Sequence, residues 1–245
     1  MDDSPSESVV RPTPESGLGF GSWMREIAEA ARATLAKPTY PDGLPRGNGE
    51  IVLLIPGFLA GDWTMHPLRD FLQHQNYRVE FAGLALNLGP TKGLMPHLEQ
   101  TVEKLHAESG APIIVVGQSL GGAFARALAH RHPDMISHVV TLCSPIRFPV
   151  ATPLESIVKL LEPLHGPDVI ALREEIVGAP GVPVTALYSK DDGIIEWQSC
   201  LQDETGDCVN VEVSGAHSAM GFNPEAQAEI ARALARVAQS RATPE

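Results

Sequence analysis

The chain has few basic residues, and this scarcity argues against partners that attract positive charge. Its 245 residues include 18 Lys and Arg against 30 Asp and Glu, which gives a formal net charge of −12 at pH 7. Nucleic acids and anionic membrane surfaces attract proteins with the opposite balance. We therefore expect neither as a partner, and we expect a small-molecule substrate that is neutral or cationic rather than anionic.

Long apolar runs and cysteines are scarce as well. The densest apolar stretches are short, such as IVLLI at 51–55 and PIIVV at 112–116, whereas a span of the bilayer needs about 20 residues. We therefore expect no stable membrane insertion. The first residues, MDDSPSESVVRPTPES, lack the basic and apolar regions of a signal peptide, so the expected compartment is the cytoplasm. Cys143, Cys200 and Cys208 fit reduced thiols there, although a Cys200–Cys208 bridge is sterically conceivable.

Strand and helix patterns alternate along most of the chain. Short β-branched runs predict strands, and the segments between them have helical spacing. Such alternation predicts a three-layer αβα sandwich with a mostly parallel sheet. The expected strands are 51–55, 78–82, 113–117, 138–143, 182–188 and 209–213, and the expected helices are about 64–75, 92–109, 120–131 and 224–239.

The chain divides into a tail, an N-terminal segment and one large α/β domain. Residues 1–18 are rich in Ser, Pro and acidic residues, which predicts a disordered tail. Residues 19–49 hold a helical pattern at 23–35, followed by a Pro- and Gly-rich loop. The α/β domain spans 50–240, and an insert at 147–180 interrupts its alternation. The insert is either a short lid over the carboxyl edge of the sheet or an ordinary crossover helix, with equal support for each.

A serine between glycines follows one of the predicted strands. The segment GQSLG at 117–121 matches the pattern G-x-S-x-G and lies between a buried strand and a helix. This is the setting of a nucleophile elbow, a strained turn that presents a serine hydroxyl at the end of a strand. The flanking glycines remove Cβ atoms that would collide with the turn. We therefore expect Ser119 to be a nucleophile rather than a helix N-cap beside incidental glycines.

A serine nucleophile needs a base, and the base needs an acid that orients it. His217 is the best candidate for the base, because it follows the last predicted strand in the loop SGAHSAMGFNP and can reach the serine turn. Asp191 and Asp192, at the end of the preceding strand, are the candidates for the acid. The order Ser, Asp, His, with each group at a strand end, is a far stronger signal than the pentapeptide alone.

Two backbone N–H groups are expected to bind the oxyanion that such a nucleophile forms. One belongs to Leu120, directly after the serine and at the start of a helix. The candidate for the other is Phe58, in the turn after strand 51–55, where Gly57 allows a close approach. The alternative for this second group is a plain Pro-Gly turn. No His, Asp or Cys pair has metal-ligand spacing on one element, so we expect no metal.

Four motifs make residues 50–240 similar to the α/β-hydrolase superfamily, in particular to its small bacterial serine esterases and lipases. They are IVLLIPGF, VVGQSLGG, YSKDDGII and GAHSAMGFNP. The resemblance implies hydrolysis of a small-molecule carboxylic ester through an acyl-enzyme, without a metal or organic cofactor. The acid of that family usually has an apolar residue three positions on, which favours Asp192, followed by Ile195, over Asp191. Gln118 stands where lipase elbows often have histidine, which argues against true lipase activity.

Besides ester hydrolysis, two further hypotheses remain compatible with this pattern. An acyltransferase or a thioesterase would use the same groups, and fold alone does not separate these activities from ester hydrolysis. A non-catalytic ligand-binding protein with the same fold is the third hypothesis, although a binder has no need of Ser119, Asp192 and His217 together. The oligomeric state stays open at this point.

Overall fold

A six-stranded sheet forms the middle layer of the structure, a computed structural model that describes residues 18, 20–35, 40–148, 150–167 and 169–242. The strands are β1 (Ile51–Ile55), β2 (Arg78–Phe81), β3 (Ile113–Gln118), β4 (Ile136–Leu142), β5 (Val184–Tyr188) and β6 (Cys208–Glu212). They run parallel in the order β2-β1-β3-β4-β5-β6. Each predicted strand is present, with ends that differ from the prediction by one or two residues at most. The predicted tail at 1–18 lies outside the described residues except for Leu18.

The central strands are buried on both faces, which explains their continuous apolar sequences. In β1, alternate side chains point to opposite sides of the sheet. Leu53 and Ile55 belong to one core, and Val52 and Leu54 belong to the other. All four side chains are completely buried.

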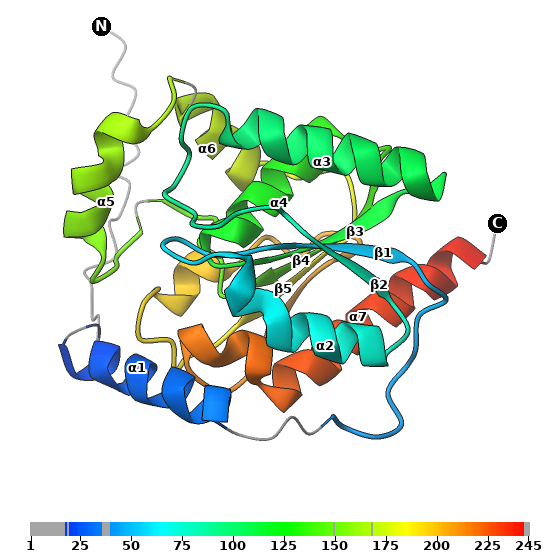
Figure 1. Ribbon diagram of the computed structural model, residues 1–245, viewed down its shortest axis with the longest axis horizontal. Helices are drawn as coiled ribbons and strands as arrows, with labels where there is room; N and C mark the ends of the chain where they lie inside the picture. Colours follow the sequence, from blue (N-terminus) through cyan, green and yellow to red (C-terminus); the bar gives the residue numbers. More distant parts are fainter. Residues whose placement is uncertain (1–17, 19, 36–39, 149, 168, 243–245) are drawn as a thin grey trace, which may run out of the picture.

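Helices cover both faces of the sheet, as the alternating pattern predicts (Figure 1). One face carries α3 (Leu94–Ser109), α4 (Leu120–Arg131) and α6 (Val169–Val177), and the other carries α2 (His66–His74) and α7 (Pro224–Ala242). Leu98 and Phe124 fill the first core, and Phe71 and Ile230 fill the second. The result is the predicted three-layer αβα sandwich.

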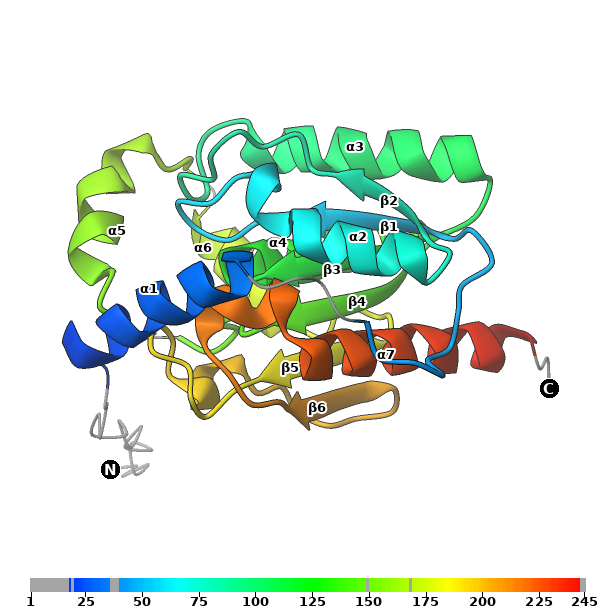
Figure 2. The same ribbon diagram turned by 60° about the horizontal axis from the view of Figure 1, so that its bottom comes forward.

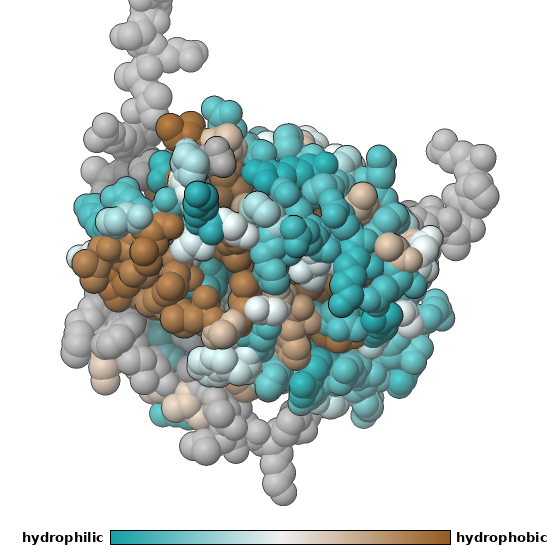
Figure 3. All heavy atoms as spheres, turned by 45° about the horizontal axis from the view of Figure 1, so that its top comes forward, coloured by the Kyte–Doolittle hydropathy of each residue, from teal (hydrophilic) through white to brown (hydrophobic). Residues whose placement is uncertain are grey.

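The insert at 147–180 contains two helices with different surroundings. In α6, Leu172 and Ile176 are buried in the core, as in a crossover helix. In contrast, α5 (Glu155–Leu161) has no buried residue. Leu160 at its end is 76% exposed, and Leu164, in the short 3-10 helix η2 (Glu162–Leu164) that follows, is 49% exposed. Apolar surface gathers where α5 lies, on the left of Figure 3. A lid function for this helix stays a prediction.

The N-terminal helix α1 (Phe20–Leu35) lies at the carboxyl end of the sheet (Figure 2). It packs against the 3-10 helix η4 (His217–Phe222), which follows β6. The prediction of a helix at 23–35 is therefore correct in type, and the observed helix begins three residues earlier. Two further 3-10 helices, η1 (Asp62–Met65) and η3 (Trp197–Cys200), complete the described elements.

Two smaller expectations concern cysteines and membranes. Cys143, Cys200 and Cys208 are free thiols, so the conceivable Cys200–Cys208 bridge is not formed. Within the described ranges, no helix combines the length and the apolar character needed to cross a bilayer.

Candidate active site

Ser119 occupies the sharp turn between β3 and α4. Its backbone has φ 53° and ψ −126°. Such a conformation costs a non-glycine residue about 1–3 kcal/mol and persists only where the surrounding structure enforces it. The N–H of Ser119 donates to the carbonyl of Leu142 at 2.8 Å, which ties the turn to β4. The turn therefore holds Ser119 at the carboxyl end of β3, where it lines a cleft.

Three glycines allow the backbone to make this turn. A Cβ atom on Gly117 would overlap the backbone of Gly121 and Gly122. A Cβ atom on Gly121 would overlap the carbonyl of Ile55, and one on Gly122 would overlap the hydroxyl of Ser144. Because most of these obstacles are backbone atoms of neighbouring strands and of the turn itself, they cannot move aside cheaply.

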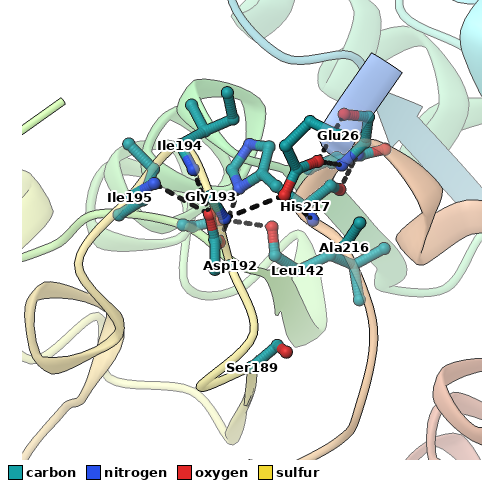
Figure 4. Close-up of polar contacts among 12 residues, drawn as sticks. Glu26, Leu142, Ser189, Asp192, Gly193, Ile194, Ile195, Ala216 and His217 are labelled. Carbon is teal, nitrogen blue, oxygen red and sulfur yellow. Dashed lines mark hydrogen bonds and ion pairs between the residues drawn. The ribbon is translucent and has the colours of Figure 1, made fainter. Parts of the chain in front are cut away.

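Asp192 and His217 meet from the loops that follow β5 and β6 (Figure 4). Oδ2 of Asp192 lies 2.7 Å from Nδ1 of His217, and both residues are buried. The other carboxylate oxygen, Oδ1, accepts the N–H groups of Ile194 and Ile195, each at 2.8 Å. The carboxylate is thus fixed in orientation, and Nε2 remains as the ring nitrogen of His217 that can exchange a proton with a third group.

The neighbouring Asp191 is directed elsewhere. It is exposed, and its Oδ2 accepts the N–H of Gly215 at 3.4 Å. Its carbonyl accepts a hydrogen bond from Arg25 at 2.5 Å. Of the two acids that the sequence offers, Asp192 is therefore the one beside the imidazole.

The surroundings of Asp192 and His217 favour their charged forms. Burial by itself raises the pKa of Asp192, but the charge of His217 and the hydrogen bonds to the carboxylate outweigh it and hold this pKa below its usual value. Burial by itself lowers the pKa of His217, but the charges of Asp192 and Glu26 and the hydrogen bond to Asp192 hold it above its ordinary value. Such a pair is suited to stabilise an imidazolium during proton transfer.

The backbone N–H groups of Phe58 and Leu120 flank the serine turn. A Cβ atom on Gly57 would lie 3.0 Å from Cβ of Ser119, so this stretch of chain passes close to the serine. Leu120 is the first residue of α4, and an N–H at that position has no acceptor within the helix. The N–H of Phe58 has no acceptor in the part of the chain that the structure describes. Both groups are therefore free to donate to a ligand.

Asn87, absent from the sequence-based predictions, holds the turn that contains Phe58. It is 1% exposed, and its carbonyl accepts the N–H of Leu59 at 2.7 Å. Its side-chain Nδ2 donates to the carbonyl of Pro56 at 2.9 Å. Leu59 has a positive φ of 57°, which these contacts hold in place. Asn87 thus fixes both ends of the short segment that presents the N–H of Phe58.

The family model of the alpha/beta hydrolase fold matches residues 50–168, which include the turn at Ser119. The chain therefore has the α/β-hydrolase fold. The match ends before Asp192 and His217, so their placement comes from the geometry above. A search of curated proteins finds no match to this chain.

Solved structures share the fold of this chain. An α/β-hydrolase enzyme from the metagenome of sediments of the Mar Chica lagoon, Morocco, is 16% identical, with a TM-score of 0.55 over 85% of this chain and 100% of that chain. The monoacylglycerol lipase of Paleococcus ferrophilus is 18% identical, with a TM-score of 0.54 over 79% and 96%. A structure of the metagenome-derived lipolytic enzymes LipS and LipT is 14% identical, with a TM-score of 0.57 over 82% and 100%. Identities this low establish the fold and no more.

A cleft of about 1070 Å³ opens at the carboxyl edge of the sheet, and both Ser119 and His217 line it. Pockets for drug-sized ligands usually enclose roughly 300–1,000 Å³, so this cleft admits a small organic molecule with room to spare. Its apolar lining includes Phe58, Leu59, Trp63, Leu154 and Phe222, and its charged lining includes Glu29, Arg32 and Asp70. Among the described residues of the insert, only Leu154 lines the cleft.

Cys143 lies beside the pair of Asp192 and His217. The three side chains offer ligand atoms that lie within 4.8 Å of one another. Among the described residues, this is the one group whose spacing resembles that of a metal site. Burial first, and then the nearby carboxylate of Asp192, raise the pKa of the Cys143 thiol well above its usual value, so this sulfur resists forming the thiolate that a metal binds. Because Asp192 also engages Nδ1 of His217, the three groups fit a hydrogen-bonded cluster better than a metal centre.

Proposed function

We propose that this α/β hydrolase is a serine esterase that cleaves small-molecule carboxylic esters through an acyl-enzyme. The observation that carries the proposal is the 2.7 Å contact between Oδ2 of Asp192 and Nδ1 of His217, beside a cleft that Ser119 also lines. An imidazole oriented by a carboxylate, close to a serine in a nucleophile elbow, is the arrangement that activates a hydroxyl.

The first half of the proposed reaction acylates the serine. Nε2 of His217 accepts the hydroxyl proton as Oγ of Ser119 bonds to the carbonyl carbon of the ester. The carbonyl oxygen becomes an oxyanion, which accepts hydrogen bonds from the N–H groups of Phe58 and Leu120. Asp192 stabilises the imidazolium. His217 then gives its proton to the leaving alkoxy oxygen, the carbon–oxygen bond breaks, and the acyl group stays on Ser119.

The second half releases the acid with water as the nucleophile. His217 accepts a proton from water while the water oxygen attacks the acyl carbon, and the same N–H groups hold the new oxyanion. The proton then returns to Oγ of Ser119 as the acyl bond breaks. Each proton and each leaving group is accounted for by this chain and water.

The cleft favours esters with apolar groups and without negative charge. Its aromatic and aliphatic lining offers contact area for an acyl or alkyl group. Glu29 and Asp70 are also part of the lining, and the chain as a whole carries a net charge of −12. An anionic substrate would therefore meet two carboxylates against one guanidinium, that of Arg32, among the charged groups of the lining.

A panel of nitrophenyl esters of increasing chain length, together with a fluorophosphonate probe, tests the proposal. The protein should hydrolyse the esters, and the probe should label Ser119 in the wild type and nothing in Ser119→Ala. Transfer of the acyl group to an added alcohol in preference to water would indicate an acyltransferase, and faster turnover of thioesters would indicate a thioesterase. A folded wild type that the probe does not label would indicate a binding protein.

A further inference from the structure

Helix α1 reaches the loops of Asp192 and His217 through polar side chains. Four of them, at positions 22, 25, 26 and 29, are spaced so that they share one face of the helix. Three of the four contact these loops as follows: Ser22 Oγ donates to the carbonyl of Gly193 at 3.3 Å, Arg25 donates to the carbonyl of Asp191 at 2.5 Å, and Glu29 accepts the N–H of Ala216 at 3.2 Å. The fourth side chain, that of Glu26, accepts four hydrogen bonds.

Glu26 is only 1% exposed, and its carboxylate accepts hydrogen bonds from four donors (Figure 4). Its Oε1 accepts the N–H groups of Gly193 at 2.8 Å and His217 at 2.9 Å. Its Oε2 accepts the N–H of Ser218 at 2.9 Å and the hydroxyl of Ser218 at 2.6 Å. Hydrogen bonds to a charged acceptor are about twice as strong as neutral ones. One side chain thus joins the loop after β5 to the loop after β6.

Three side chains hold His217 in place, and Glu26 is one of them. Glu26 accepts its backbone N–H, and Nε2 of Gln118 donates to its carbonyl at 2.9 Å. Asp192 holds the ring at Nδ1. Gln118 directly precedes the serine in the sequence, so the backbone of His217 is tied both to the elbow and to α1. The imidazole therefore keeps its place relative to Ser119 only while both ties hold.

Glu26 also acts on His217 through its charge. The carboxylate is buried and touches the peptide N–H of the histidine, and its negative charge is among the causes that raise the pKa of His217. Glu26 does not belong to the lining of the cleft. Its influence on a bound ester would therefore pass entirely through the two loops.

We propose that Glu26 is a positioning residue for the esterase reaction, an inference that rests on the function proposed above. Its carboxylate locks the Asp192 loop to the His217 loop and stabilises the protonated imidazole, without touching the substrate. Helix α1 precedes residues 50–168, where the family model matches, so this support comes from a segment outside the matched core.

Replacing Glu26 by glutamine tests this role at nearly constant size. The amide oxygen can still accept, but the NH2 group cannot, so one side of the carboxylate loses its donors and the charge disappears. A small displacement of a catalytic group costs roughly 10²-fold in rate. We expect Glu26→Gln to lower kcat by about 10- to 100-fold and to leave KM within about threefold, because the cleft lining is unchanged. Glu26→Asp, which keeps the charge, should retain the acid limb of the pH profile.

Arg25→Met is the matched control on the same helix. It removes another contact between α1 and the acid loop but leaves all four bonds to Glu26 in place. Its kcat should stay within about twofold of the wild type. A similar loss of kcat in both variants would show that docking of α1 in general, and not the carboxylate, is what matters, and would overturn the proposal.

An NMR titration of the His217 imidazole gives a readout that does not depend on turnover. Removal of a nearby negative charge destabilises the imidazolium, so protonation should move to lower pH in Glu26→Gln and stay near the wild-type value in Glu26→Asp and Arg25→Met. A titration and a kcat that do not change, in a variant that merely melts earlier, would overturn the proposal. If the wild type shows no esterase activity, the titration still decides the role of Glu26 separately.

Discussion

Two helices outside the sheet, α1 and α5, differ in their relation to the cleft: α1 contributes Glu29 and Arg32 to its lining, whereas no residue of α5 belongs to it. Helix α1 turns a polar face inward, and Glu26 on this face is buried, with two hydrogen-bond donors to each of its carboxylate oxygens. Helix α5 follows Leu154, which lines the cleft, but Leu160 on the helix is 76% exposed. A helical pattern in the sequence predicted neither arrangement. The face of a helix that packs against the protein depends on the groups on the surface that it contacts. For α1, those groups are backbone N–H donors of two loops.

The two helices also differ in how much free energy their contacts contribute to stability. A buried carboxylate without partners costs several kcal/mol, so the bonds of Glu26 cannot be removed singly without consequence. An exposed leucine forgoes about 1.5–3 kcal/mol of burial and loses little when it is replaced. We call the surroundings of Ser119, Asp192 and His217 the polar side of the cleft, and the surroundings of Leu154 the insert side. We therefore expect changes on the polar side to affect turnover of every ester, and changes on the insert side to affect only the preference among esters.

The largest effect is expected from Ser119→Ala, at the centre of the polar side. Loss of the acyl acceptor should reduce kcat by roughly 10⁴-fold or more for short and long esters alike. Circular dichroism should show an unchanged fold, because the hydroxyl faces the cleft. Residual activity above about 1% of the wild type in pure protein would point to a different nucleophile.

The next largest effect should separate the two adjacent acids. Asparagine cannot hold the productive tautomer of His217 or balance its charge, so Asp192→Asn should lower kcat by up to roughly 10⁴-fold. Asp191 is exposed, and among the described residues its side chain makes only the long 3.4 Å contact to Gly215, so Asp191→Asn should cost about tenfold or less. The reverse ranking would transfer the orienting role to Asp191.

The pH dependence of kcat/KM should reflect the same polar cluster. His217 must be neutral to accept the serine proton, so activity is lost as the pH falls through its pKa in the folded protein. Because its two acidic neighbours hold that pKa above the ordinary 6.5, the acid limb should have its midpoint above pH 6.5 and fall about tenfold per pH unit below it. A flat profile down to about pH 5 in folded protein would remove His217 from the role of base.

The smallest effect should come from the insert and should depend on chain length. Leu154→Ser removes an apolar contact from the cleft and should lower kcat/KM several-fold for long esters and little for acetate, since one lost apolar contact is worth about 1–3 kcal/mol. Leu160→Ser is the matched control, and its exposed side chain should change neither. A loss for long esters in Leu160→Ser as well would mean that α5 closes over the substrate as a lid.

The sheet and the neighbourhood of the elbow could be predicted from the sequence because their causes are local. Buried parallel strands need runs such as that of β3, and the turn at Ser119 needs Gly117 and Gly121 beside it. The carboxyl ends of parallel strands share one edge, so the loops of Asp192 and His217 had to lie near the serine. The resemblance to the family also favoured Asp192, whose Oδ1 accepts the N–H of Ile195, the apolar residue three positions on.

The supporting residues could not be predicted, because their partners are far away in the sequence. Asn87 bonds to a carbonyl 31 positions away, Gln118 to one 99 positions away, and Glu26 to an N–H 191 positions away. Each is a polar residue of a common type, and nothing in its own segment distinguishes it from a solvated side chain. Only the tertiary arrangement shows which of them is buried and satisfied.

The tie between Glu26 and His217 also orders events during synthesis. Helix α1 leaves the ribosome long before the N–H groups that donate to Glu26, because these belong to residues 193, 217 and 218. Until residue 218 has been made, Glu26 lacks the full set of donors that it has in the folded protein. Closing so long a loop is entropically costly, so this contact forms after the sheet that positions the two loops. We therefore expect His217 to reach its final position late in folding, when α1 docks onto the two loops.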